Sequence, residues 1–289
     1  MTTPPGRRVT PWWNRLDDDT SLFDAPGPRG RRRIAVATTV SLLVMAALAV
    51  VAVHQFAVNG QLDPSKWQLF TQGPVLRYLL TGLWATAEVT LVSGAIAFPI
   101  GALLALARVT GPPLLRLPAA WYVEVLRAVP LLLLVYAFLF GLPNEGIRLS
   151  LFWMLVWPIT LTNAAVLAEI FRSGVNAVPE GQSEAGHALG LGRWATMRLV
   201  VLPQAARRSA PALISQLVRL LKDSTLGYVV SFPELLQSAK VLGEFNHAIV
   251  QSYFVVALVY VTVNVTLASL AGRFERRTGG SVRGLTRRR

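Results

Sequence analysis

The chain has 289 residues, of which 53% are hydrophobic and only 15% are charged, and it contains no cysteine. About a quarter of the residues in a soluble domain are charged, so the composition excludes an ordinary soluble domain. The lack of cysteine excludes disulfides, thiol catalysis and cysteine-based metal sites. The formal net charge of +13 leaves two interpretations open, a nucleic-acid partner or a charge bias across a membrane.

The first predicted elements are a basic cytoplasmic tail at 1–33 and a transmembrane helix at 34–56. The tail is rich in proline, glycine and arginine and has no apolar period, so we expect it to be disordered. The 20 residues that follow it carry no charge, and about 20 apolar residues span a bilayer as a helix. A cleaved signal peptide is the rival interpretation, but the long leader and the lack of a small-residue cleavage site argue against it.

Five further apolar segments follow a polar, proline-containing linker and form a predicted core at 76–275. A second basic cytoplasmic tail is expected at 276–289. The chain is therefore predicted to be an all-α polytopic membrane protein with a five-span core and one extra N-terminal transmembrane helix. The expected spans of the core are 76–107, 117–141, 150–173, 209–231 and 248–272.

Lysine and arginine are unevenly divided between the two sides of the predicted membrane. One side holds both tails and carries 21 of these residues. The other side carries four: Lys66, Arg77, Arg148 and Lys240. Because cytoplasmic loops are enriched in lysine and arginine, both termini are expected in the cytoplasm. Topology and attraction to the anionic lipid bilayer then explain the net charge, and nucleic acid becomes the weaker interpretation.

A stripe of small residues runs along the first span of the core. Ser93, Ala97, Gly101 and Ala105 recur every four residues. Because residues four apart share one face of a helix, the stripe predicts that another helix approaches closely there.

Polar residues lie inside the second and third spans of the core. A charge at mid-membrane costs at least ~2.5–3.5 kcal/mol, so such groups should face the protein interior, water or one another. Glu124 and Arg127 are three residues apart, and we expect a structural ion pair between them. Thr162 and Glu169 are seven residues apart and share a helix face, while Asn163 lies about 100° round the helix. These last three are candidates for a substrate path.

The fourth span of the core has a polar stripe on one side. Its polar residues are Gln216, Arg219, Lys222, Asp223 and Ser224. Gln216, Arg219 and Asp223 fall within roughly 60° of one another, and Ala212 and Gly227 extend the same face. Such a stripe is typical of a helix that lines a translocation path, and its charges of both signs suit a zwitterionic ligand. The alternative is a buried ion pair between Arg219 and Asp223 that only holds helices in register.

Between the third and fourth spans the sequence at 179–203 reads PEGQSEAGHALGLGRWATMRLVVLP. This pattern predicts a short helix that begins near Pro179 and ends at Gly190. A second short helix is expected at 194–202, stopped by Pro203. Two short helices with a glycine corner between membrane spans indicate a docking element rather than a catalytic loop.

No catalytic, metal-binding or nucleotide-binding motif accompanies this stretch. The chain has no GxxxxGK[ST] phosphate-binding loop, so we expect no cofactor in it, and any ATP must be bound by a partner subunit. Its three histidines, His54, His187 and His247, are too scattered to indicate a metal site. The chain is therefore predicted not to be an enzyme.

Residues 184–203 resemble the cytoplasmic loop signature of ABC importer permeases. That signature is Glu-Ala-Ala, three residues, Gly, nine residues, Ile, any residue and Leu-Pro. Two positions depart from it, since Gly186 replaces the third alanine and Val200 replaces isoleucine, and a glycine weakens a helix by up to ~1 kcal/mol relative to alanine. The signature positions here are Glu184, Ala185, Gly186, Gly190, Leu202 and Pro203.

Further segments look like the branch of this family that imports polar amino acids, and they follow in its order. The resemblance covers roughly 76–275 and is greatest to glutamate-type permeases, some of which also carry an extra N-terminal span. One departure is the order Ser224, Thr225, where the branch usually has Thr-Ser. The segments are YVEVLRAVPL from Tyr122, LAEIFRSG from Leu167, VPEGQ from Val178, LPQA from Leu202 and LKDSTL from Leu221.

The resemblance implies a multi-pass transport subunit of the bacterial cytoplasmic membrane with a cytoplasmic coupling loop at 174–208. A second permease chain, identical or paralogous, would complete the translocation path. An ABC ATPase dimer would receive the Glu184 helix on the cytoplasmic side, and an extracytoplasmic substrate-binding protein would deliver the substrate. Rigid-body motion of the ATPase pair could then rock the membrane helices.

Two other classes of protein stay open. An ion-coupled secondary amino-acid transporter could use Glu124, Glu169 and Asp223 as proton or sodium sites. Such transporters often contain structural repeats, and no convincing half-to-half repeat is found here. A membrane scaffold or sensor would not need the polar stripe of the fourth core span.

Overall fold

The computed structural model describes residues 27–279, and every regular element in that range is a helix. The all-α class predicted from the composition is confirmed. The residues fall into two units, one ending at Leu62 and the other beginning at Asp63, and each is described by itself. Of the predicted tails at 1–33 and 276–289, residues 1–26 and 280–289 lie outside the described residues.

The first unit is one long helix, α1 (Pro28–Val58), which buries none of its side chains. It is long and apolar enough to cross a membrane, as expected for 34–56. The helix begins six residues earlier than predicted, because Pro28 occupies the first turn, where its missing N–H is tolerated. The arginines at 29–33, which are good helix formers, therefore belong to this helix and not to a disordered tail.

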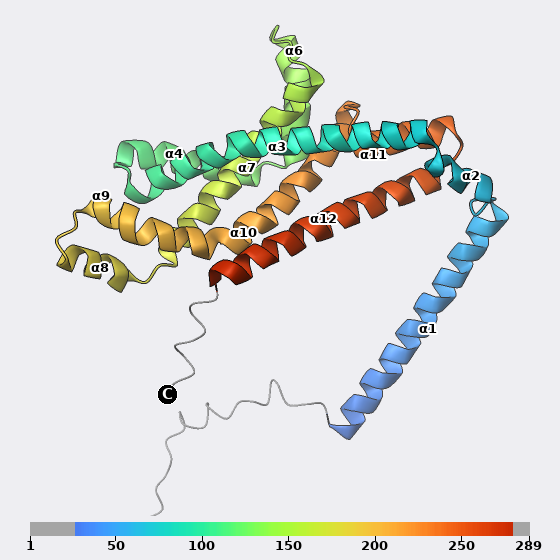
Figure 1. Ribbon diagram of the computed structural model, residues 1–289, viewed down its shortest axis with the longest axis horizontal. Coiled ribbons are helices and arrows are strands. Elements are labelled where there is room, and N and C mark those ends of the chain that lie inside the picture. Colours follow the sequence, from blue (N-terminus) through green and yellow to red (C-terminus); the bar gives the residue numbers. More distant parts are fainter. Residues whose placement is uncertain (1–26, 280–289) are drawn as a thin grey trace, which may run out of the picture. The chain divides into compact units, whose positions relative to one another are not determined.

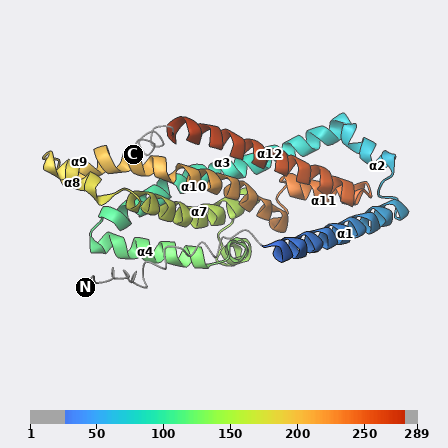
Figure 2. The ribbon, with the colours of Figure 1, turned by 90° about the horizontal axis from the view of Figure 1, so that it is seen from below.

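The second unit contains four long helices. Helix α7 contacts α3 and α10, and α10 in turn contacts α12. The coupling-loop helices α8 and α9 lie at one end of these helices, and α11 lies at the other (Figures 1 and 2). The long helices are α3 (Gly73–Thr110), α7 (Leu151–Asn176), α10 (Leu202–Asp223) and α12 (Ile249–Gly279).

The small-residue stripe on α3 is where α7 approaches. All four stripe residues, 93, 97, 101 and 105, are buried. A Cβ atom added to Gly101 would lie 2.7 Å from the Cβ of Leu167 and 2.9 Å from the carbonyl oxygen of Ala164. The Ser93 hydroxyl reaches the carbonyl oxygen of Val156 at 3.5 Å. The predicted close helix contact is confirmed.

The unit begins with α2 (Pro64–Gln68) and a 3₁₀ turn (Leu69–Thr71) that lead into α3. The Asp63 carboxylate caps α2 by accepting hydrogen bonds from the backbone N–H and the hydroxyl of Ser65, at 2.9 and 2.8 Å. These hydrogen bonds, the backbone one first, keep the pKa of Asp63 below its ordinary value.

The predicted span at 117–141 is broken into two parts. Helix α4 (Pro113–Ala128) ends before Pro130, and the helical segment that starts at α5 (Leu131–Tyr136) continues at an angle of 98° to it. Proline cannot donate to a helix and pushes the residue before it into an extended conformation, which Val129 adopts (φ −77°, ψ 126°). The segment ends with a π-helical turn (Ala137–Gly141) and α6 (Leu142–Asn144), which projects from the long helices (Figure 1).

The predicted span at 209–231 combines two helix types. Helix α10 ends at Asp223 and is followed by a 3₁₀ helix (Ser224–Val230), which stops where Ser231 takes a left-handed conformation, φ 55°. Among the described residues, four helices are long and apolar enough to cross a membrane, or five if the bent pair is one span. Helix α10 is not one of them. Its charged residues are Arg207, Arg208, Arg219, Lys222 and Asp223.

Helix α11 (Leu235–Phe245) lies between the predicted spans at 209–231 and 248–272, where no element was predicted. Its N-cap is Glu234, a fully buried residue whose carboxylate accepts the backbone N–H groups of Leu236 and Gln237 at 2.9 and 2.7 Å. The hydroxyl of Tyr260 donates to the same carboxylate at 2.9 Å. This acidic cap therefore joins α11 to α12.

Candidate functional site

Helix α8 (Glu180–Ala188) contains the Glu-Ala-Gly part of the loop signature. Gly190 follows it with φ +81°, a left-handed conformation that favours glycine. The N–H of Leu191 donates to the Gly186 carbonyl at 3.1 Å, and the N–H of Gly190 donates to the His187 carbonyl at 2.9 Å. These bonds terminate the helix as a glycine C-cap does, and the predicted role of Gly190 is confirmed.

Gly186 packs against Thr196, a residue of the second short helix, α9 (Arg193–Thr196). A Cβ atom at Gly186 would lie 2.8 Å from Cγ2 of Thr196 and 3.1 Å from its Oγ1. Both residues are buried, and the Thr196 hydroxyl donates to the Leu191 carbonyl at 3.4 Å. The glycine that departs from the family signature therefore makes room for this threonine.

The second short helix does not stop at Pro203 as predicted. A π-helical turn (Met197–Val201) connects α9 to α10, and Pro203 stands in the first turn of α10. At that position a proline needs no backbone partner for its missing N–H. The loop therefore runs into α10 without a flexible joint.

Side-chain contacts also fasten α8 to the membrane helices. The Gln204 amide of α10 donates to the side-chain oxygen of Gln182 in α8 at 3.0 Å. Val178, Val201 and Ala205 form a small buried apolar cluster between the end of α7, the π-helical turn and α10. These contacts connect the coupling loop to the end of α7 and to α10.

The outer surface of the coupling loop is open to a partner. Glu184 and Ala185 are exposed on α8. Leu189 is 82% exposed and Trp194 is 58% exposed. Leu202 and Pro203 are exposed at the start of α10. Exposed leucine and tryptophan beside an acidic residue are typical of a surface that another protein covers.

We expect the effect of alanine at position 186 to depend on Thr196. Gly186→Ala alone should lower the hydrogen-exchange protection of α8, because the clash opposes a helix-propensity gain of up to ~1 kcal/mol. Adding Thr196→Ala should restore protection, with a coupling of about 0.5–3 kcal/mol between the two sites. The control is Gly181→Ala, also in α8, where the added Cβ meets no atom within 4 Å. Equal gains from Gly181→Ala and Gly186→Ala with Thr196 present would contradict this packing.

The polar residues predicted on two separate spans meet at Asn163. The Gln216 amide of α10 donates to the Asn163 side-chain oxygen at 2.5 Å. The Asn163 amide donates to an Asp223 carboxylate oxygen at 3.0 Å and to the Ile159 carbonyl at 2.9 Å. One asparagine of α7 therefore links two polar groups of α10, one of them charged.

The alternative ion pair between Arg219 and Asp223 does not form, since no salt bridge joins them within the part of the chain described. Arg219 and Lys222 are exposed, and Asp223 is half-buried against Asn163. The predicted stripe ends at Asp223, because the change to a 3₁₀ helix takes Gly227 off that face.

Two other path candidates turn inward. Ser224 is fully buried and its hydroxyl donates to the Leu221 carbonyl at 2.7 Å. Thr162 is buried, and its hydroxyl has no hydrogen-bond partner among the described residues. Neither side chain reaches the exposed face on which Arg219 and Lys222 lie.

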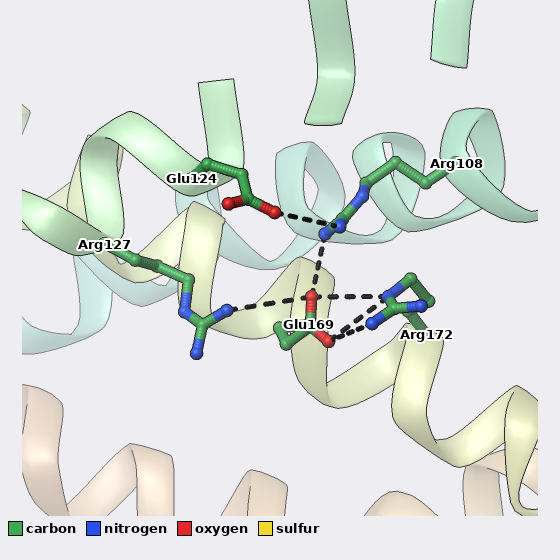
Figure 3. Close-up of polar contacts among 5 residues, drawn as sticks. All are labelled: Arg108, Glu124, Arg127, Glu169 and Arg172. Atoms are coloured by element: carbon green, nitrogen blue, oxygen red, sulfur yellow. Dashed lines mark hydrogen bonds and ion pairs between the residues drawn. The ribbon is translucent and has the colours of Figure 1, made fainter. Parts of the chain in front are cut away.

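Glu169, the remaining candidate of α7, is the centre of an arginine cluster (Figure 3). Its carboxylate contacts a guanidinium nitrogen of Arg172 at 2.6 Å, of Arg108 at 2.8 Å and of Arg127 at 3.8 Å. The predicted pair of Glu124 with Arg127 is wrong, because Glu124 lies 4.0 Å from Arg108 instead. Contacts across three helices replace the local pair because α3, α4 and α7 converge here.

Two sets of residues at the site were not predicted from the sequence. Arg108 was counted only for topology, although it follows Ala105 by three residues and so continues the stripe that faces α7. The second set lies on α12, where Tyr253, Tyr260 and Asn264 share one helix face by their spacing. With Lys222 they line a cavity of about 650 Å³ between α10 and α12.

Comparisons with known proteins identify the chain's relatives. The family model for the binding-protein-dependent transport system inner membrane component matches residues 97–280. The glutamate transport system permease protein GluD of Corynebacterium glutamicum is 39% identical over 222 residues, which cover 75% of this chain and 81% of that protein. The glutamine transport system permease protein GlnP of Escherichia coli is 32% identical over 206 residues, 71% of this chain and 94% of that protein.

Solved structures of ABC transporters are also similar to this chain. A crystal structure of an amino acid ABC transporter with histidines is 30% identical, with a TM-score of 0.67 over 70% of this chain and 94% of that one. The inward-facing MetNI methionine ABC transporter, 23% identical with a TM-score of 0.58 over 72% of this chain and 99% of that one, shares the fold. The secondary-transporter alternative finds no support among these relatives. The chain therefore belongs to the family of binding-protein-dependent transport system inner membrane components, the permease subunits of ABC importers.

Proposed function

We propose that this chain is the permease subunit of an ATP-driven importer of polar amino acids, with glutamate or a close relative as the substrate. The observation that carries this proposal is the exposed signature helix α8, whose Gln182 is hydrogen-bonded to Gln204 of α10. The core at 76–275 is the permease proper, the coupling loop is 174–208, and the helix at 34–56 is an additional membrane span. The 39% identity with a glutamate permease supports the substrate class.

Energy would come from a separate ABC ATPase dimer that receives α8 on the cytoplasmic side. The chain has no phosphate-binding loop of its own, so ATP is expected to bind to that partner. Because residues 193–223 are helical without a break and Gln182 of α8 is hydrogen-bonded to Gln204 of α10, rotation of the ATPase subunits would rock α10. Such rigid-body rocking gives alternating access.

A second permease chain, identical or paralogous, would cover the exposed face of α10. Arg219 and Lys222 cannot face hydrocarbon without a cost of at least ~2.5–3.5 kcal/mol each, so this face needs a water-filled path or a partner. An extracytoplasmic binding protein would deliver the substrate to this path. By the positive-inside argument, both termini lie in the cytoplasm of a bacterium and the core lies in its cytoplasmic membrane.

The charges near Asn163 favour a substrate with a carboxylate. Asp223 already accepts a hydrogen bond from Asn163 at 3.0 Å. Arg219 and Lys222 are exposed, and neither has a salt bridge to another described residue. The groups left for a ligand are therefore cationic, which suits the carboxylates of glutamate.

The test is reconstitution of the chain with its ATPase and binding protein in vesicles. ATP-dependent uptake of labelled glutamate, above that of arginine, is the expected result. Uptake that follows a proton or sodium gradient without ATP would contradict the proposal. Glutamine and aspartate in the same panel define the substrate within the polar amino acids.

A further inference from the structure

A second charged region lies on the coupling-loop side of the path, beside the arginine cluster. An open cavity of about 350 Å³ is lined by α4, α7 and the first turns of α10. Its polar lining comes from all three helices: Arg127, Glu169, Ser173, Arg208 and Ser209. Small residues leave the space open, and Gly174 lets α10 approach so closely that a Cβ there would lie 3.1 Å from the Ala205 carbonyl.

The Glu169 carboxylate in this cavity already accepts hydrogen bonds from neighbouring arginines. Both oxygens of Glu169 accept hydrogen bonds from Arg172, and one also accepts from Arg108 at 2.8 Å. Arg127 is left with a longer contact of 3.8 Å to the same group. Its side chain is 48% exposed, and it makes no hydrogen bond to another described residue. Its planar set of N–H donors is therefore available to a ligand.

Arg208 faces the same cavity from α10. It is exposed and has neither a hydrogen bond nor a salt bridge within the described part of the chain. Four guanidinium groups thus surround two carboxylates in this region, those of Glu124 and Glu169. An excess of positive charge at the end of membrane helices attracts an anion, and guanidinium groups bind carboxylates through paired hydrogen bonds.

We propose that this cavity is an exit-side anion site that binds a carboxylate of the transported amino acid between Arg127 and Arg208. The inference rests on the proposed import of acidic amino acids. The substrate would pass from the region of Asn163 to these arginines before it leaves towards the coupling-loop side. The site is separate from the Asn163 group, since it shares none of the hydrogen bonds found there.

The experiment measures maximal uptake of L-glutamate by the reconstituted full complex at saturating binding protein, together with its ATP hydrolysis. Arg127→Gln and Arg208→Gln should each lower uptake about tenfold, because each removes a charged hydrogen-bond partner. Hydrolysis should be retained, and Arg127→Lys and Arg208→Lys should recover most of the uptake. The matched control is Arg116→Gln, an exposed arginine of α4 that lies outside the coupling loop and does not line the cavity. It should leave uptake unchanged.

Three results would overturn the site. The glutamine variants could transport as the unaltered chain does, Arg116→Gln could lose as much as Arg127→Gln, or uptake and hydrolysis could fall together, which would mark a coupling defect. Inorganic sulfate and glutamate are each added in excess on the coupling-loop side. If the site accepts any anion, sulfate should slow uptake. If the site is selective for the amino acid, glutamate should slow uptake and sulfate should not. Failure of the unaltered complex to import any amino acid would instead contradict the proposed function.

Discussion

Glu184→Lys is expected to abolish ATP-driven uptake while the chain still inserts and folds. Glu184 is exposed on α8 and forms no hydrogen bond or salt bridge with another described residue, so its replacement costs the chain little. Reversing a charge in a protein interface costs several kcal/mol, which lowers the affinity for the ATPase by about 100-fold or more. Co-purification of the ATPase, substrate-stimulated hydrolysis and uptake should all be lost together.

The control for this variant is Glu244→Lys. Glu244 is also an exposed glutamate on a short helix, but it belongs to α11 at the opposite end of the long helices (Figure 1). The Glu244→Lys chain should retain its ATPase. Normal hydrolysis and uptake in the Glu184→Lys complex would refute the docking role of α8.

Asp223→Ala and Arg219→Ala are expected to slow uptake without preventing assembly of the complex. Asp223→Ala removes the hydrogen bond that Asn163 donates to the carboxylate. A hydrogen bond to a charged group contributes about 1.5–3 kcal/mol, which corresponds to an uptake rate about 10–100-fold lower if passage of the substrate depends on this bond. Arg219 forms no salt bridge in the described structure and acts on Asp223 only through its charge, so a large effect of its replacement is expected to come from the substrate or a partner.

Initial uptake rates and size-exclusion profiles of the complex separate the two effects. Ser215→Ala is the matched control, because Ser215 is exposed on α10 and its hydroxyl only donates to the Pro211 carbonyl of its own helix. If both charge variants import at the normal rate in an intact complex, the polar face of α10 is structural.

Helix spacing and capping rules predicted those features of the fold that depend on residues close together in the sequence. The stripe from Ser93 to Ala105 marked where α7 packs, and Gly190 marked the end of α8, because both follow from helix geometry. The family signature further identified the coupling loop. Its departure at Gly186 could not be explained from the sequence, since Thr196 becomes its neighbour only through the turn between α8 and α9.

The errors arise where distant residues compete with near ones. The spacing of Glu124 and Arg127 predicted an ion pair between them, but Arg127 contacts Glu169, which lies on another helix. Membrane helices tolerate proline, so the pattern around Pro130 did not distinguish a straight span from one bent by 98°. Helix α11 is shorter than a membrane span, and it is held by its buried cap at Glu234 and by an apolar face that packs against α3 and α12.

The position of Glu169 also restricts how this protein can change over generations. One carboxylate is the shared counter-ion of arginines contributed by three segments of the gene. If Glu169 were lost first, three arginines would be left with only the 4.0 Å contact between Arg108 and Glu124 as compensation, a step that is costly by itself. An accessible order of mutations removes the arginines one at a time and the glutamate last. Variant libraries sorted for folded chain in the membrane, and not for uptake, should therefore recover losses of Arg127 far more often than losses of Glu169.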